Sequence, residues 1–289
     1  MRQLDAGDAR TELADTPFFP QERYQCGPAA LTTALTMSGA DVKLEEIVDK
    51  VYLPGKSGSL QAEMLAATRT SGRLPYVIDG TLSAIQAELL AGRPVIVLQN
   101  LGVAAIPRWH FAVVVGVDAA NDRIILRSGT DRRRVTATDV FLRTWQRGDY
   151  WALVVLRPEE LPAAVDKARY FKAVSALEQA GRLDAAAIAW ETALATWPGN
   201  PIALFGLGNV RLASGRPAEA EKIYRALLEQ DAQQTGARNN LALALAGQQR
   251  FHEALAEIEL ALEQNTVAAL EGELRDTQAT IRNKAQESK

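Results

Sequence analysis

Residues 24–31 of the chain read Tyr24-Gln25-Cys26-Gly27-Pro28-Ala29-Ala30-Leu31, and they hold the only cysteine among 289 residues. Gly27 allows a sharp turn, and Pro28 suits the first helical position, where a missing N–H has no cost. We therefore expect a helix from Ala29 to Met37, with Cys26 at its N-terminus. The helix macrodipole favours negative charge there, which predicts a lowered thiol pKa and a nucleophilic cysteine.

The second motif is an apolar run with a histidine near its start, Trp109-His110-Phe111-Ala112-Val113-Val114-Val115-Gly116-Val117-Asp118. Such a run predicts a buried strand. The only other histidine, His252, falls in the second half of the chain and is interpreted as a surface residue. Histidine is the natural base for a thiol because its pKa lies near neutral pH. We therefore expect Cys26 and His110 to form a catalytic pair.

Together with Gln21, these two motifs resemble the papain-like cysteine peptidases, most of all the bacteriocin-processing, double-glycine leader peptidase family. The resemblance covers roughly residues 17–157. It implies a Cys26 thiolate paired with His110, and an oxyanion hole formed with the help of Gln21. Gln21 stands one residue closer to Cys26 than is usual in the family, so Gln25 remains a second candidate.

The same resemblance raises the question of a third catalytic residue. The family places an Asp or Asn after the strand that follows the histidine, where it orients the imidazole. The corresponding segment here is Leu126-Arg127-Ser128-Gly129, which puts Ser128 in that position. A serine hydroxyl can accept the imidazole N–H but carries no charge. Asp118 ends the His110 strand and is expected to lie too far away, so we predict a Cys–His dyad oriented by Ser128.

Periodicity and turn signals fill in the rest of the first half. We expect helices over 41–51, 59–69 and 81–90, the last capped by Thr81, and a helix to Trp145 capped by Thr138 or Asp139. Strands are expected over 74–78, 94–98, 109–117, 123–127 and 150–156. Helices first and a mostly antiparallel sheet afterwards make an α+β layout. The charged run of residues 131–134 is interpreted as a solvated face.

The second half has a different composition and an internal repeat. Residues 1–16 are expected to form a flexible tail, 17–157 the papain-like domain, and 158–166 a linker with two prolines. Beyond it a 34-residue period, the length of the tetratricopeptide repeat, fits without gaps. The units are 167–200, 201–234 and 235–268.

Small residues recur at equivalent positions of these units, as Ala186, Ala220 and Ala254, and the middle unit keeps the Leu207-Gly208 pair. Small side chains let two antiparallel helices approach closely, and each helix pair must stack on a neighbour to bury its face. A polar helix over 271–284 would cap the open end. We therefore expect an all-α domain over 167–289 that presents a groove to a peptide or protein.

Composition excludes several function classes. The net charge of −3 gives no general attraction to nucleic acid. A single cysteine cannot form an intrachain disulfide, and with only two histidines in the chain a structural metal site is not expected. The sequence therefore predicts no cofactor. No apolar run approaches the roughly 18 residues that span a bilayer. The compartment stays open: cytoplasmic by default, or periplasmic or envelope-associated if an N-terminal signal was removed.

The sequence thus predicts a cysteine peptidase that cleaves a peptide or protein, with the repeats recruiting substrate or a protein partner. Because the usual acidic third residue is replaced, one alternative is a catalytically weak papain-like module that acts as a binding scaffold. Another is an acyl transferase or deamidase, which uses the same Cys–His chemistry with a different acceptor.

Overall fold

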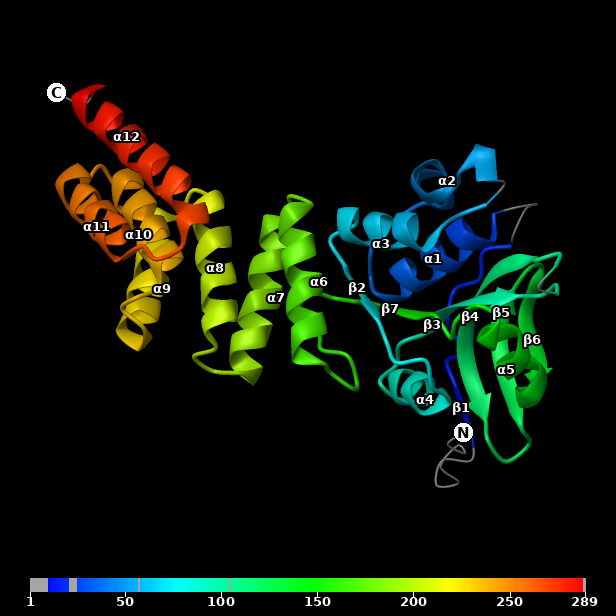
Figure 1. Cartoon of the computed structure of the whole chain (residues 1–289). Helices are drawn as coiled ribbons and strands as arrows, with labels where there is room; N and C mark the ends of the chain where they lie inside the picture. The colour runs from blue at the N-terminus through cyan, green and yellow to red at the C-terminus, as the bar shows by residue number, and fades with distance from the viewer. Residues whose placement is uncertain (1–9, 21–24, 57, 104, 288–289) are drawn as a thin grey trace. The chain divides into compact units, whose positions relative to one another are not determined.

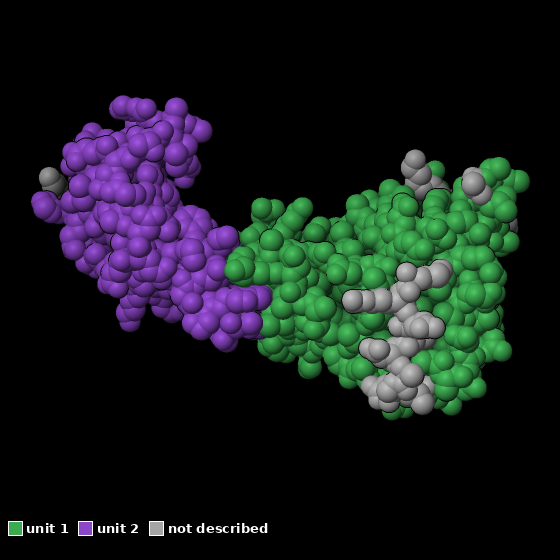
Figure 2. All heavy atoms as spheres, turned by 60° about the horizontal axis from the view of Figure 1, so that its bottom comes forward, with its two compact units in different colours: residues 1–182 green, residues 183–289 purple. Residues whose placement is uncertain are grey.

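The structure is a computed structural model of the 289-residue chain, and it describes residues 10–20, 25–56, 58–103 and 105–287. Two compact units divide the chain, residues 1–182 and residues 183–289 (Figures 1 and 2). The first contains an antiparallel sheet with helices, and the second is helical in its described residues. The predicted fold class, an α+β part followed by an all-α part, is confirmed.

The sheet of the first unit runs in the order β2-β7-β3-β4-β5-β6, and all of its neighbouring pairs are antiparallel. Its strands are β2 (Leu74–Val77), β3 (Val95–Asn100), β4 (Trp109–Asp118), β5 (Arg123–Ser128), β6 (Asp131–Ala137) and β7 (Ala152–Leu156). The central strands β7, β3 and β4 are buried along most of their length, which explains why their sequences are continuous apolar runs.

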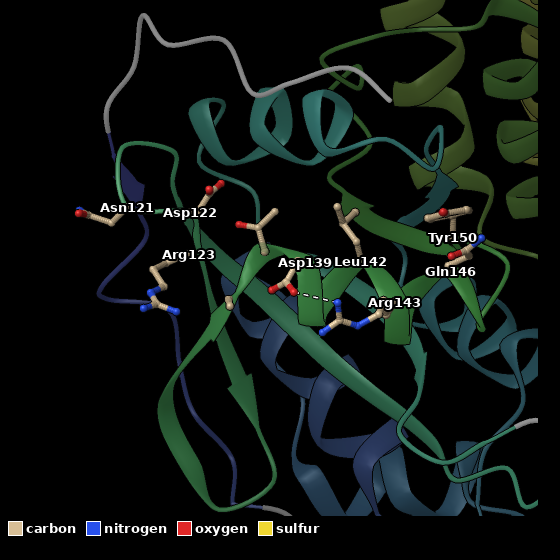
Figure 3. A pocket seen from close by; sticks show the side chains of 10 residues that line it. Asn121, Asp122, Arg123, Asp139, Leu142, Arg143, Gln146 and Tyr150 are labelled. Atoms are coloured by element: carbon tan, nitrogen blue, oxygen red, sulfur yellow. Dashed lines mark hydrogen bonds and ion pairs between the residues drawn. The ribbon is translucent and has the colours of Figure 1, made fainter.

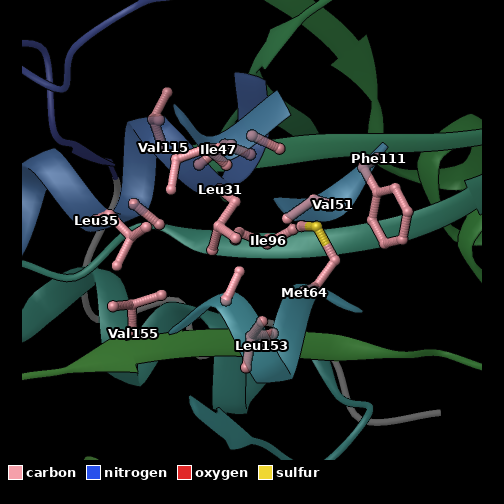
Figure 4. Packing of buried hydrophobic residues seen from close by; sticks show 14 of the residues in the cluster. Leu31, Leu35, Ile47, Val51, Met64, Ile96, Phe111, Val115, Leu153 and Val155 are labelled. Carbon is pink, nitrogen blue, oxygen red and sulfur yellow. The ribbon is translucent and has the colours of Figure 1, made fainter. Parts of the chain in front are cut away.

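One face of the sheet is covered by α1 (Cys26–Met37), with α2 (Leu44–Val51), a 3₁₀ turn (Pro54–Lys56) and α3 (Gln61–Thr70) beyond it. Leu31 and Leu35 of α1 pack with Phe111 and Val115 of β4 in the main core (Figure 4). The helix begins at Cys26, three residues earlier than predicted. Because the Ala29 N–H bonds to the carbonyl of Gln25 at 3.1 Å, Cys26 and Gly27 already belong to the first turn.

Two further helices belong to this unit, α4 (Leu82–Leu90) and α5 (Thr138–Gln146). The predicted cap of α4 is confirmed, since the Ala84 N–H donates to Thr81 Oγ1 at 3.1 Å. The predicted cap of α5 is wrong. Ala137 occupies that position, and no side chain bonds the first turn.

Residues 11–16, which belong to the predicted flexible tail, are ordered in the structure. Residues 11–12 form β1 (Thr11–Glu12), which pairs with β4, and the Leu13 N–H bonds to the Val115 carbonyl at 2.8 Å. Gly116 makes the approach possible, because a Cβ there would lie 2.8 Å from the Thr11 carbonyl oxygen. The sheet therefore holds the segment that leads toward Cys26.

The predicted linker, residues 158–166, is bonded to the first unit. The Ala163 N–H donates to Glu88 Oε1 at 2.7 Å, and the Asp166 N–H donates to the Tyr76 hydroxyl at 2.9 Å. The following helix, α6 (Lys167–Gln179), belongs to the same compact unit, whose limit falls after residue 182. The first helix of the predicted repeat array is thus grouped with the sheet.

The second unit consists of helices at regular intervals. They are α7 (Leu183–Thr196), α8 (Pro201–Ala213), α9 (Pro217–Gln230), α10 (Thr235–Gly247), α11 (Phe251–Gln264), a 3₁₀ turn (Ala268–Leu270) and α12 (Glu271–Glu287). Helices α6, α8 and α10 begin at the first residues of the predicted repeats, and α7, α9 and α11 each begin 16 residues later. Leu274 and Ile281 bury α12 against the same core, as expected of a capping helix.

Close helix packing in this unit leaves no room for a side chain at some glycines, and Gly208 is one of them. A Cβ on Gly208 would lie 2.6 Å from the Tyr224 ring, whereas a Cβ on Gly272 would meet nothing within 4 Å. We predict that Gly208→Val lowers the free energy of unfolding by about 1–3 kcal/mol through overpacking. The same change at Gly272 should stay within about 0.5 kcal/mol. Urea unfolding followed by circular dichroism measures both, and equal effects would show that the helices are not in this contact.

Candidate active site

Cys26 is the first residue of α1, and its side chain is partly buried beside the core. Gly27 follows it, and a Cβ there would press against the side chain of Ser59. Three backbone groups hydrogen-bond to the thiol, those of Cys26, Gly27 and Phe111, and each favours the thiolate. The helix N-terminus therefore acts on the sulfur in the predicted direction.

The net effect on the thiol is nevertheless the opposite of the prediction. Burial raises the pKa of Cys26, and it outweighs the three backbone hydrogen bonds. Desolvation disfavours a charged thiolate in apolar surroundings. The expected low pKa of Cys26 is thus wrong for the chain as folded here, because burial favours the neutral thiol.

His110 is the second residue of β4, and its ring is hydrogen-bonded to Ser128, the residue that the family resemblance selected. Nε2 of His110 and Oγ of Ser128 lie 2.8 Å apart, and the tautomer decides which atom donates. Ser128 ends β5 and is buried. The serine thus stands where the family pattern expects an acid, and its hydroxyl can hold the ring in one orientation.

The surroundings keep this imidazole neutral. Burial lowers the pKa of His110 to about 4, and the positive charges of Arg134 and Arg108 act in the same direction. A neutral ring can accept a proton at neutral pH, so it can serve as a general base. The pair therefore rests as thiol and imidazole, not as an ion pair.

The structure brings the two groups to the same end of β4 without bonding them directly. The thiol bonds the backbone of Phe111, the residue after His110. In the described residues no hydrogen bond joins the Cys26 sulfur to the imidazole ring, whose side-chain partner is Ser128. Apo active sites commonly show such loose geometry, which tightens when substrate binds.

The structure gives no catalytic contact for the other predicted site residues. Gln21 lies outside the described residues. Gln25 takes the N-cap position of α1, and its side chain makes no capping hydrogen bond. Asp118 accepts hydrogen bonds from Asn121 at the far end of β4, so it is engaged away from His110, as expected.

Sequence reasoning missed Gln99, a buried polar residue in the neighbouring strand. Gln99 of β3 lies directly opposite His110 in the register, and its Nε2 donates to Thr144 Oγ1 of α5 at 2.6 Å. The sequence feature that could have indicated Gln99 is a polar residue directly after the apolar run 94–98. Gln99 links the strand beside His110 to the helix on that face.

Sequence reasoning also missed Arg127, the neighbour of Ser128. Its side chain is only 4% exposed and donates to the carbonyls of Ala14, Thr16 and Arg132 at 2.6–3.2 Å. A buried guanidinium needs such partners, because an unpaired charge is expensive to bury. Arg127 thus ties β5 to the N-terminal segment that precedes Cys26.

Elsewhere in this unit a cavity of about 510 Å³ opens between the β4–β5 turn and α5 (Figure 3). Polar side chains line much of it, and Asp139 pairs with Arg143 at 2.8 Å. Within the described ranges, no three His, Cys, Asp or Glu side chains gather as metal ligands. No helix among the described residues is long and apolar enough to span a bilayer.

A thiol at a helix N-terminus and a histidine near the start of β4, in an α+β unit, are consistent with a papain-like fold. Residues 13–150 match the family described as Peptidase_C39 like, and residues 171–235 and 207–269 match the tetratricopeptide repeat. Residues 13–150 therefore match a C39-like peptidase domain and residues 171–269 match tetratricopeptide repeats, in the order that the sequence motifs predicted.

Three solved structures are similar to parts of the chain. A C39-like peptidase from Bacillus anthracis shares 14% identity over 52% of this chain and 98% of its own, with a TM-score of 0.45. The Sgt2 TPR domain from Aspergillus fumigatus shares 20% sequence identity, and the match covers 43% of this chain and 82% of that domain, with a TM-score of 0.38. A double glycine motif protease from an AMS/PCAT transporter, in complex with the leader peptide, shares 20% sequence identity. The match covers 49% of this chain and 91% of that protease, with a TM-score of 0.37. No curated protein matches the chain.

The lowered pKa of His110 makes stability depend on pH. The unfolded chain binds a proton at this residue below about pH 6.5, whereas the folded chain resists it down to about pH 4. The contribution is therefore complete above pH 6.5 and is lost as the pH falls through about 4. We predict that His110→Gln flattens the urea-measured stability between pH 7 and 4 relative to the parent. An unchanged pH slope would show that His110 is not buried in its neutral form.

Proposed function

We propose that the first unit is a cysteine peptidase in which Cys26 is the nucleophile, His110 the general base and Ser128 the residue that orients the imidazole. The hydrogen bond between His110 and Ser128, at 2.8 Å, carries the assignment because it fixes the ring at the strand end where the thiol also lies. The match of residues 13–150 to the C39-like family supports the same reaction class.

The neutral resting pair suggests how the proton moves. His110 takes the thiol proton as the sulfur attacks the substrate carbonyl carbon, so the charges form only during the reaction. The C–N bond then breaks, the imidazolium gives its proton to the leaving amine, and a thioester remains. Water attacks the thioester with His110 again as base, which releases the acid and restores the thiol. Gln21 and Gln25 both remain candidates for stabilising the oxyanion.

A binding scaffold is the second candidate, and one observation favours it. In the described structure the sulfur and the imidazole are not hydrogen-bonded, and burial holds both groups neutral. The side-chain partner of the ring in the described part of the chain is the uncharged hydroxyl of Ser128. A domain that kept the fold without efficient chemistry would have these features.

The repeats supply the protein-binding part of the proposal. Arrays of helix pairs present an extended surface to a peptide or a protein partner. We assign residues 183–289 the role of recruiting the substrate or a partner of the peptidase unit, consistent with the repeat matches.

Alkylation of the single cysteine tests the Cys–His pair, since any label must be on Cys26. We predict that the parent reacts with iodoacetamide at neutral pH with the help of His110. His110→Ala should move the onset of alkylation to higher pH, toward the raised pKa of the isolated thiol. His252→Ala, in the repeat unit, is the matched control. Mass spectrometry reads the labelled fraction, and identical profiles for parent and His110→Ala would favour the scaffold. Peptide turnover that survives Cys26→Ala would end the peptidase assignment.

Replacing Ser128 tests the role of the third residue. An aspartate at this position would place a negative charge beside Nε2 and stabilise the imidazolium. We predict that Ser128→Asp raises the pKa of His110 above about 4 and extends Cys26 alkylation to lower pH. NMR titration of the imidazole measures the first effect. Ser128→Ala, which removes the hydroxyl without adding charge, should not produce either change.

A further inference from the structure

His110 has a polar neighbour on each side in the sheet. Strand β4 lies between β5 and β3 (Figure 1), and on the β5 side Ser128 Oγ is 2.8 Å from His110 Nε2. On the β3 side Gln99 is directly opposite His110 in the register. Directly opposite side chains share one face of a sheet, with their Cβ atoms about 5 Å apart. The imidazole therefore stands between two uncharged polar side chains.

The hydrogen bonds around Gln99 orient its carboxamide. Its Nε2 donates to Thr144 Oγ1 of α5 at 2.6 Å, and the Thr144 hydroxyl donates its one hydrogen to the Phe141 carbonyl at 2.8 Å. A flipped amide would need that same hydrogen and would break the bond to the carbonyl. The network thus keeps the NH2 group toward α5, and Oε1, the negative end of the amide dipole, points away from Thr144.

The oxygen of this amide is uncommitted. Gln99 is only 4% exposed, and among the described residues its side chain makes one hydrogen bond, the bond to Thr144. The preceding residues on the same face of β3, Val95 and Val97, are apolar and fully buried. Burying a polar group costs free energy unless the group is paired. Holding α5 to β3 therefore accounts for the amide nitrogen but not for the oxygen.

The charges around the imidazole oppose its protonation. Those that act on it belong to Arg134 of β6 and Arg108 just before β4, and both are positive. Asp131 of β6 is exposed, Arg147 of α5 is bonded to a backbone carbonyl of β3, and burial favours the neutral thiol of Cys26 on α1. Within the described part of the chain, a neutral dipole is thus left to favour the imidazolium. The acids of α4, α5 and β1 are each paired with an arginine: Glu88 with Arg93, Asp139 with Arg143 and Glu12 with Arg133.

We propose that Gln99 is a positioning residue for His110, and that its carboxamide, oriented by Thr144, turns its oxygen toward the imidazole and stabilises the positive charge of the protonated ring. This inference rests on the proposed function, since it takes His110 to be the base for Cys26. No bond is made or broken at Gln99. The proton passes from the sulfur to the ring, and the preoriented amide dipole stabilises the charge that results.

Alkylation of Cys26 by iodoacetamide, followed by mass spectrometry, measures this effect without a peptide substrate. Gln99→Met keeps the length of the side chain and removes the amide. We expect it to lower the alkylation rate at neutral pH about fivefold, the size of one neutral hydrogen bond. Gln86→Met is the matched control and should leave the rate unchanged. Gln86 is also buried, but it belongs to α4, which contacts β1 at the other end of β4.

A double variant separates this role from a merely structural one. Because Gln99 acts through the ring, Gln99→Met should have no further effect on alkylation in a chain that already carries His110→Ala. If Gln99 served only to hold α5 to β3, its loss would slow alkylation by the same factor in both backgrounds. Circular dichroism confirms that each variant is folded.

A second variant tests the same contact by charge. Gln99→Glu has nearly the shape of the parent and places a carboxylate where the amide oxygen lies. It should raise the pKa of His110 by about 1 to 3, as a neighbouring opposite charge does. NMR titration of the imidazole measures this change, and it requires no activity of the enzyme.

Three outcomes would overturn the role of Gln99. They are an alkylation rate that falls in His110→Ala but not in Gln99→Met, an equal loss in both backgrounds, and a pKa of His110 that Gln99→Glu leaves unchanged. Failure of the proposed function looks different. If Gln99→Glu raises the pKa of His110 but His110→Ala does not alter alkylation, Gln99 faces the ring as inferred and the peptidase assignment falls.

Discussion

The burial of the first turns of α1 against the sheet is the constraint on which the site depends. Residues 27–35 are all buried, so this helix has no solvent-facing stripe and cannot rotate without exposing core. The hydroxyls of Thr32 and Thr33 bond back to the carbonyls of Pro28 and Ala29, so they add no unpaired polar group. The sheet thereby fixes Cys26 relative to the start of β4, although the residue lies at a helix end.

The same burial explains why a serine suits position 128. A buried carboxylate beside His110 would need a charged imidazolium to balance it, and the pKa of about 4 shows that the pocket resists that charge. A hydroxyl satisfies Nε2 without any charge. The missing acid of the family pattern and the neutral resting pair are therefore consistent with one another.

The features that were predictable from sequence are those set by local chemistry or by repetition. The 34-residue period located the starts of α8 and α10, because each repeat meets the same packing problem as its neighbour. The resemblance to the family selected Ser128, whose Oγ lies 2.8 Å from His110 Nε2.

The features that failed depend on contacts between distant segments. The raised pKa of Cys26 comes from tertiary burial, which overrides the local effect of the helix terminus. Residues 11–16 are ordered by β4 and by Arg127, which is more than 100 residues away in sequence. In the same way, α6 follows the repeat period but bonds the sheet unit through Arg169 and Asp79 at 2.9 Å.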